Sequence, residues 1–310
     1  MYPNNLSSLI CYIITIIMVM VGVAFLTLLE RKLLGYIQAR SGPNKVGMVG
    51  IFQPFSDAIS LFTKEHSILE FYNFFPFFIS PIFGLMIALL FWFIFPSEFL
   101  ILDMKWGVIF FLCCSSFSVY SILGAGWASN SKYASLGAYR GVAQTISYEV
   151  SFALIILSVI LMISSFNFLS FLSFQSEMIF MVGFFPLFLA WFVSCLAETN
   201  RSPFDFSEGE SELVSGFNVE YMSSGFALIF LAEYANILLM SMVTSILFFG
   251  SLFLTLKVLF FALAFIWIRG SFPRFRYDKL MMMAWKSYLP LSLNFIVVVL
   301  GFKSLFQYIF

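Results

Sequence analysis

The chain has 310 residues, of which 61% are hydrophobic and only 10% are charged, and its mean hydropathy is +0.99. This composition excludes a soluble domain, because several apolar runs reach the roughly 20 residues that match the hydrocarbon core of a bilayer. The 16 basic and 16 acidic residues cancel, and no basic run is suited to nucleic acid. We therefore expect an all-α polytopic membrane protein that forms a single membrane domain over residues 1–310.

Long apolar runs predict about eight transmembrane helices. They lie roughly at 6–29, 74–95, 106–127, 141–163, 178–197, 221–248, 251–269 and 288–308. The first residues enter an apolar run without the basic leader of a signal peptide or the Arg-rich stretch of a transit peptide. We therefore expect the protein to be inserted into the membrane where the chain is made.

The basic residues predict the orientation of these spans. Most Lys and Arg residues flank the odd-numbered connections, whereas Lys105, Lys257 and Lys303 fall near the even-numbered side. The positive-inside rule then places the odd connections in the cytoplasm or matrix and both termini outside. Lys257 lies inside the seventh expected span, and two interpretations stay open: its side chain extends to the outer interface, or it pairs with an internal carboxylate.

Residues 50–64 predict an amphipathic helix in the membrane interface. Its apolar face would hold Ile51, Phe52, Phe55, Ala58, Ile59 and Phe62, with polar residues on the other face. The helix could be a simple anchor, or it could cover a lateral opening for a lipid-soluble molecule. The pattern does not separate these interpretations.

An inward-facing acidic loop spans about 198–220, between two apolar runs. Its carboxylates at Asp205, Glu208, Glu210 and Glu212 are close enough in sequence to titrate as a coupled set that stores protons near neutrality. Two other interpretations remain: Ser207 and Glu210 fit the capping box of a short helix, and the whole segment could be a solvated acidic loop.

Four acidic residues lie in or against the expected spans: Glu30, Glu149, Glu198 and Glu233. An ionised carboxylate is costly in lipid, so such groups usually face the protein interior and serve transport. The alternative for Glu149 and Glu233 is a hydrogen bond between helices without a transport role. For Glu30 the alternative is a surface ion pair, because Arg31 and Lys32 follow it.

The sequence offers no recognisable site for a redox metal. Cys11, Cys113, Cys114 and Cys195 lie in apolar runs without the spacing of a zinc or iron–sulfur motif, and we interpret them as buried small hydrophobes. The single histidine, His66, cannot provide a pair of haem ligands.

Long polar motifs give the chain a resemblance that covers nearly its whole length. They read ERKLLGYIQARSGPNKVG at 30–47, GWASNSKYA at 126–134, AQTISYEV at 143–150, AETNRSPFDFSEGESELVSGFNVEY at 197–221 and PRFRYD at 273–278. With these motifs the chain resembles the family of subunit 1 of the mitochondrial proton-pumping NADH:ubiquinone oxidoreductase, respiratory complex I. No departure is found at the family's key charged positions.

The resemblance implies roles for named residues. It implies a ubiquinone tunnel framed by the first span, the interfacial helix and the sixth span, with charged tunnel residues Glu30, Arg31, Arg40, Asp57 and Arg269 and an apolar wall at Phe226. It further implies a proton-coupling route through Asp205, Glu208, Glu210 and Glu212, then Glu198, Glu149 and Glu233. The chain would carry no redox centre, and ubiquinone would be its substrate.

The resemblance also implies a place and partners. Electrons would come from an iron–sulfur cluster in a neighbouring hydrophilic-arm subunit, and other membrane-arm subunits would adjoin the chain in the mitochondrial inner membrane. Both termini would then face the intermembrane space and the odd-numbered loops the matrix. Two other classes stay open: a free-standing cation or solute transporter, and the related membrane subunit of a membrane-bound hydrogenase, which would lack a quinone.

Overall fold

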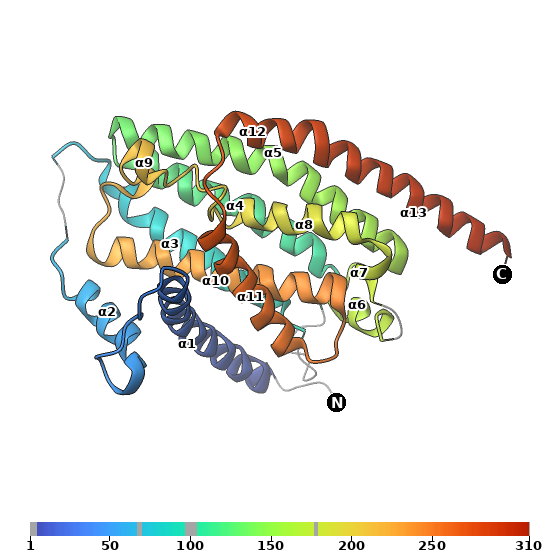
Figure 1. Cartoon of the computed structure of the whole chain (residues 1–310), viewed down its shortest axis with the longest axis horizontal. Helices are drawn as coiled ribbons and strands as arrows, with labels where there is room; N and C mark the ends of the chain where they lie inside the picture. The colour runs from blue at the N-terminus through green and yellow to red at the C-terminus, as the bar shows by residue number, and fades with distance from the viewer. Residues whose placement is uncertain (1–4, 67–69, 97–103, 177–178, 310) are drawn as a thin grey trace.

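The computed structural model describes residues 5–66, 70–96, 104–176 and 179–309, and within these ranges all regular structure is helical (Figure 1). The helices are α1 (Asn5–Ile37), α2 (Gln53–Phe62), α3 (Phe74–Phe91), α4 (Gly107–Ala128), α5 (Lys132–Ile163), α6 (Phe168–Phe174), α7 (Phe180–Gly183), α8 (Phe185–Glu198), α9 (Glu210–Leu213), α10 (Ser223–Phe249), α11 (Leu254–Ser271), α12 (Tyr277–Met282) and α13 (Leu289–Ile309). A π-helical stretch, Met283–Tyr288, joins α12 to α13. The expected all-α polytopic class is confirmed.

Within the described ranges, seven helical segments are long and apolar enough to cross a membrane. They are Leu9–Ile37, Phe74–Ile94, Gly107–Ala128, Lys132–Ile163, Ser223–Phe249, Leu254–Ser271 and Tyr277–Leu305. The expected span at 178–197 differs, because it is divided into α7 and the 14-residue α8, and its first residue lies outside the described ranges. Pro186 explains the start of α8: proline lacks an N–H and fits the first turn of a helix, whereas Phe184 before it is not helical.

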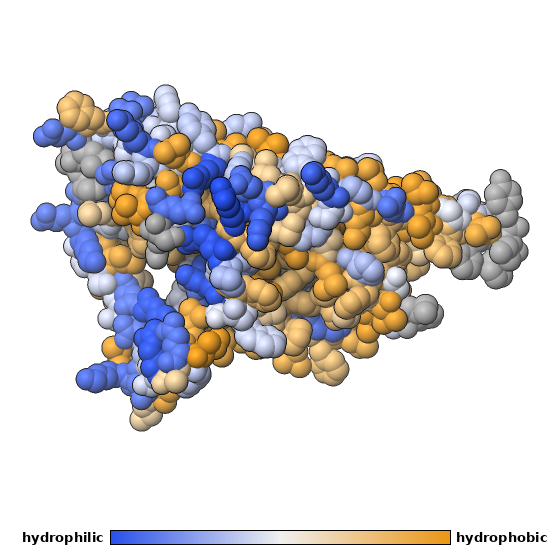
Figure 2. Space-filling view, turned by 45° about the horizontal axis from the view of Figure 1, so that its top comes forward, coloured by the Kyte–Doolittle hydropathy of each residue, from blue (hydrophilic) through white to orange (hydrophobic). Residues whose placement is uncertain are grey.

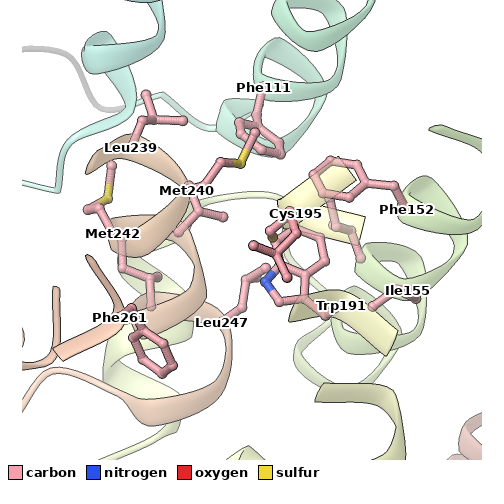
Figure 3. Close-up of a cluster of buried hydrophobic side chains, with 14 of the residues drawn as sticks. Phe111, Phe152, Ile155, Trp191, Cys195, Leu239, Met240, Met242, Leu247 and Phe261 are labelled. Carbon is pink, nitrogen blue, oxygen red and sulfur yellow. The ribbon is translucent and has the colours of Figure 1, made fainter. Parts of the chain in front are cut away.

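The apolar core is built where α4, α5, α8, α10 and α11 meet (Figure 3). Trp191 of α8 is fully buried and stacks on Phe152 of α5, with ring centroids 4.4 Å apart. Cys114 and Cys195 are buried as expected, but Cys113 is exposed. Consecutive residues of a helix point about 100° apart, so Cys113 faces away from the core that its neighbour enters.

A proline inside α3 creates a polar anchor for the start of α10. Pro81 has no N–H to donate to the carbonyl of Phe77, so that carbonyl is free to accept a hydrogen bond from elsewhere. Tyr221 supplies it from its hydroxyl at 3.1 Å, and its ring stacks on Phe77 at 4.3 Å. The Tyr221 hydroxyl also lies 3.0 Å from the Ser80 hydroxyl. The loop before α10 is thereby fixed to α3.

Polar side chains gather at the end of the molecule that holds α2 and α9, whereas the end near the C-terminus is largely apolar (Figures 1 and 2). The acidic loop and the connection between α1 and α2 both lie at this polar end. A concentration of polar groups at one end fits the expectation of one working surface.

The expected amphipathic helix at 50–64 is present as the shorter α2. Met48–Gly50 forms a separate 3-10 turn, and Pro54 in the first turn of α2 fixes where the helix begins. Phe55, Ile59 and Phe62 are exposed on α2. An apolar exposed face of this kind is typical of a helix lying in the membrane interface.

Candidate functional site

Helix α10 has a cavity on each of two faces. Leu231 and Tyr234 contribute to one cavity, and Ala232, Glu233 and Asn236 contribute to the other. Neighbouring residues of a helix point in different directions, so adjacent side chains such as Glu233 and Tyr234 can line different spaces. We call the first space the α2 cavity and the second the bundle cavity.

The α2 cavity lies between α1, α2 and α10 and has a volume of about 260 Å³. Its lining is Val23, Ala24, Thr27, Arg31, Pro54, Asp57, Ala58, Leu61, Phe62, Phe226, Ala227, Phe230, Leu231 and Tyr234. Arg31 forms an ion pair with Asp57, whose other carboxylate oxygen accepts a hydrogen bond from Gln53 at 2.8 Å. The cavity thus combines apolar walls with one charged edge.

These contacts bear on three expected tunnel residues. Arg31, Asp57 and Phe226 line the same cavity, as the expected tunnel requires. Arg40 does not: it is exposed, and its Nε donates to the side chain of Gln38 at 2.9 Å. Helix α2 forms one wall of the cavity, and its interpretation as a cover over an opening stays a prediction.

Glu30 lies seven residues before the end of α1 and is only 4% exposed, so its interpretation as half of a surface ion pair is wrong. Its carboxylate pairs with Arg201 at 3.4 Å and also with Arg269, while the adjacent Arg31 turns to Asp57. A buried carboxylate needs such partners, since an unpaired charge away from water is costly. Glu30 and Arg269 thus pair with each other, but neither is among the residues that line the α2 cavity, so their expected role in a tunnel stays a prediction.

Arg201, in the loop after α8, links this charged pair to α10. Its side chain is 9% exposed, and its guanidinium carbon lies 4.3 Å from the centre of the Tyr234 ring, a cation–π contact. Tyr234 itself lines the α2 cavity. A change of charge in that cavity would therefore act through Tyr234 on the electrostatic energy of the Glu30–Arg201 pair.

The acidic loop holds its carboxylates in different environments instead of one cluster. Asp205 is paired with Arg274 at 3.3 Å, whereas Glu212 is exposed and pairs with Arg140 at 2.5 Å. The side chain of Glu210 lies outside the described part of the structure. The expected coupled set of four is thus divided, because Asp205 and Glu208 interact with each other whereas Glu212 pairs with Arg140.

Glu208 is the loop carboxylate that turns inward. Burial and the nearby Asp205 raise its pKa to about 7, and its partners are the amide of Asn218 at 2.9 Å and the carboxyl of Glu233. Burial also raises the pKa of Asp205, although Arg274 opposes the shift. Glu208 can therefore gain or lose a proton near neutral pH.

The proposed capping box of Ser207 and Glu210 is wrong. Helix α9 is preceded by Gly209, and no side chain caps it. Ser207 is fully buried, and its carbonyl accepts the N–H of Phe217 at 3.3 Å. Gly216 sits against that carbonyl so closely that a Cβ would lie 1.8 Å from the oxygen. The loop is closed by this backbone contact, which only glycine permits.

The bundle cavity lies between α3, α4, α8 and α10. Its lining is Ser80, Pro81, Gly84, Ser118, Ser121, Ile122, Ala125, Glu198, Thr199, Asn200, Phe217, Ile229, Ala232, Glu233 and Asn236. Glu198 and Glu233 are thus neighbours of one polar space, and Glu198 accepts a hydrogen bond from the hydroxyl of Tyr148. Glu149 is half-buried on α5, one residue beyond Tyr148.

The contacts of Lys257 bear on its two interpretations, extension to the membrane interface and pairing with an internal carboxylate. Its ammonium group donates to the carbonyl of Phe249, the last residue of α10, at 2.5 Å. Lysine near a helix C-terminus satisfies carbonyls that have no partner within the helix. Lys257 thus stabilises the C-terminal end of α10, and among the described residues it forms no ion pair with a carboxylate.

Comparison with known proteins identifies the family of the chain. A family described as NADH dehydrogenase matches residues 10–300. The chain belongs to this family. It is 58% identical to NADH-ubiquinone oxidoreductase chain 1 of Aedes aegypti, over 97% of each chain. It is 57% identical to the protein of the same name from Anopheles gambiae over 98% of each chain, and 52% identical to that from Balaenoptera physalus over 91% of this chain and 92% of the other.

Sequence reasoning about this family member assigned no role in the site to Arg201 and Arg274. Each lies beside an acidic residue that was singled out, but the pairing depends on residues distant in sequence, such as Glu30 with Arg201. The available signal was weak: Arg201 follows the end of an apolar helix directly, where an unpaired charge would be costly.

Proposed function

We propose that the chain is a membrane subunit of a mitochondrial NADH:ubiquinone oxidoreductase, in which it binds ubiquinone and couples its reduction to proton translocation. The observation that carries the proposal is the pair of cavities on two faces of α10, one largely apolar and one acidic, with Arg201 and Tyr234 between them. The names of the relatives support the assignment to this oxidoreductase.

The α2 cavity suits the head of a quinone. A quinone ring and its isoprenoid tail are apolar, whereas its two carbonyl oxygens accept hydrogen bonds. Phe226, Phe230 and Leu231 offer an apolar wall, and Arg31 offers a donor at one edge. Because α2 presents apolar side chains outward, a quinone dissolved in the bilayer could approach the cavity from the side.

Coupling would begin with the charge change that accompanies quinone reduction. Reduction to quinol takes up two electrons and two protons, so any delay between electron and proton alters the charge beside Tyr234. The charge of Arg201 interacts with that change through the ring of Tyr234, and Glu30, Glu208 and Glu233 interact electrostatically with Arg201. The response would be a shift of protons among Asp205, Glu208 and Glu233.

From these groups the route continues through Glu198 and Glu149 into neighbouring membrane subunits. In this arrangement the chain receives electrons from an iron–sulfur cluster held by a hydrophilic-arm subunit docked at its polar end. That end faces the matrix, and both termini face the intermembrane space. A free-standing transporter is less well supported, since the relatives are named as chains of an oxidoreductase.

Photoaffinity labelling tests the quinone site. A photoreactive quinone added to native membranes should label peptides within 30–64 and 200–236, and natural quinone should compete. Ala227→Phe, which fills the α2 cavity, should reduce labelling and quinone reduction by about tenfold or more, because ring and head group would overlap. Leu228→Phe is the matched control, since Leu228 lines a different pocket. Equal labelling in both variants would contradict the site.

Proton pumping tests the coupling route. The double variant Glu149→Gln, Glu233→Gln should lose pumping while keeping side-chain volume at both positions. The measurement is acidification of the outside medium per NADH oxidised in tightly sealed vesicles. Full pumping by this variant would contradict a proton route through these two carboxylates.

A further inference from the structure

Helix α2 is attached to two different helices. It stands apart from the main bundle at the polar end of the molecule, with α1 and α10 as its neighbours (Figure 1). On the α1 side, Asp57 pairs with Arg31, and the ring of Phe55 lies edge-on to that of Phe25 with centroids 6.1 Å apart. These contacts involve residues 55 and 57, so they hold the first half of the helix. The second half needs a contact of its own.

Ser223, the first residue of α10, supplies that contact. Its hydroxyl lies 2.8 Å from the carbonyl oxygen of Lys64 and 3.3 Å from that of Leu61. A serine hydroxyl donates one proton, so the two carbonyls share it, and the nearer carbonyl of Lys64 is the better acceptor. The last carbonyls of a helix have no partner within the helix, and a donor from another element can satisfy them. Ser223 therefore caps the C-terminal end of α2 from α10.

The backbone conformation of Ser223 indicates a role for its side chain. Its φ is +56°, in the left-handed region that glycine adopts without steric cost and that residues with a side chain rarely adopt. Ser223 is only 3% exposed, so solvent does not replace the contacts of its hydroxyl. A strained backbone persists where the surrounding structure fixes it. What serine provides here, and glycine could not, is the hydrogen bond to the end of α2.

The anchored end of α2 belongs to the wall of the α2 cavity. Leu61 and Phe62, the last two residues of the helix, both line the cavity. On α10, Phe226 and Ala227 line it as well, and they follow Ser223 by three and four residues, which places them on the same side of the helix. Loss of the hydrogen bond from Ser223 would therefore free the part of the wall that Leu61 and Phe62 form.

We propose that Ser223 is a positioning residue for quinone: by holding the end of α2 on α10, it keeps Leu61 and Phe62 in the wall of the α2 cavity and so sets the affinity for quinone. This inference rests on the proposed function, because it takes the α2 cavity as the quinone site. Ser223 is not among the lining residues of that cavity, so it acts through α2 and not by contact with the ligand. Its hydroxyl keeps its proton throughout.

Two substitutions at this position separate the hydroxyl from the backbone. Ser223→Ala and Ser223→Gly both remove the hydroxyl, but only glycine relieves the strain of the positive φ. In the assembled oxidoreductase, we expect both to raise the KM for a short-chain ubiquinone about fivefold, the size of one lost hydrogen bond, with kcat nearly unchanged. A role limited to the backbone of α10 predicts instead that Ser223→Gly behaves like the natural protein and that only Ser223→Ala is impaired.

Ser224 provides the control in the same turn of α10. It is partly exposed, and its hydroxyl is 3.5 Å from Nδ1 of His66, at the limit of a hydrogen bond. Ser224→Ala should leave the KM for quinone unchanged. Oxidation of NADH by an artificial acceptor measures the amount of assembled enzyme in each variant. A lower kcat with an unchanged KM in both Ser223 variants would mean a loss of enzyme alone and would overturn the inference.

The variant Ala227→Phe distinguishes this inference from the proposed function. If Ala227→Phe reduces quinone reduction while both Ser223 variants keep the natural KM, the role of Ser223 is overturned and the quinone site stands. If Ala227→Phe also has no effect, the quinone site fails and the inference fails with it. Should the Ser223 variants not assemble, a density map of the unmodified complex decides: a Ser223 hydroxyl within hydrogen-bond distance of the Lys64 carbonyl supports the inference, and a hydroxyl directed elsewhere overturns it.

Discussion

The two cavities on α10 differ in how the charged residues of their linings are paired. In the α2 cavity the charges of Arg31 and Asp57 satisfy each other at the edge, and the rest of the wall is apolar. In the bundle cavity, carboxyl and amide groups converge from α8 and α10 with no cation of their own in the lining. The first environment suits an apolar ligand, and the second suits mobile protons. One helix borders both cavities because its faces carry different residues.

The largest effect is expected from substitution of Arg201, the buried cation that contacts Tyr234 of the α2 cavity. Arg201→Met removes the buried cation and leaves Glu30 with Arg269 alone, which is expected to destabilise the fold by about 3–5 kcal/mol. The amount of assembled complex in membranes should fall severely. Arg276→Met is the control: its pair with Asp278 is largely exposed and is worth about 0–1 kcal/mol. Similar assembly of the two variants would refute a central role for Arg201.

The second prediction concerns Glu208, whose protonation should make the stability of the protein depend on pH. Its pKa is raised from 4.5 to about 7, so between these values the unfolded chain ionises while the folded loop keeps its proton. Stability is therefore present below about pH 4.5 and is lost as pH rises through about 7, by roughly 3 kcal/mol at most.

Glu208→Gln should remove this dependence and be more stable than the natural protein at pH 8, with little difference at pH 5. Thermal inactivation of the complex across this range is the measurement. Glu212→Gln is the control, because Glu212 is exposed beside Arg140. An unchanged pH slope in Glu208→Gln would mean that the loop carboxyl does not hold its proton.

The smallest effect is expected at the edge of the α2 cavity. Arg31 and Asp57 are partly exposed, so the loss of their ion pair in Asp57→Asn should cost about 0–1 kcal/mol in stability. The apparent affinity for quinone should change more than the melting temperature, since Arg31 would be released from its partner. A larger effect on melting than on quinone affinity would show that the pair is chiefly structural.

The membrane-spanning helices could be predicted from the sequence because their apolar runs are long and continuous. The break between α7 and α8 was missed, although Pro186 signals it, because an apolar run does not show where a backbone turns. The acidic residues of the site were likewise visible as exceptions in an apolar chain. Their partners were not visible: Glu30 with Arg201 and Asp205 with Arg274 join segments far apart in the sequence.

The sequence by itself determined the class of protein, the family and the residue types available for chemistry, since these follow from local composition and motif. Tertiary structure alone decided which carboxylates are buried, which are paired and which share a cavity. The physical reason is that the energy of a charge depends on its distance to other charges and to water, and in a folded helix bundle those distances are set by packing between helices.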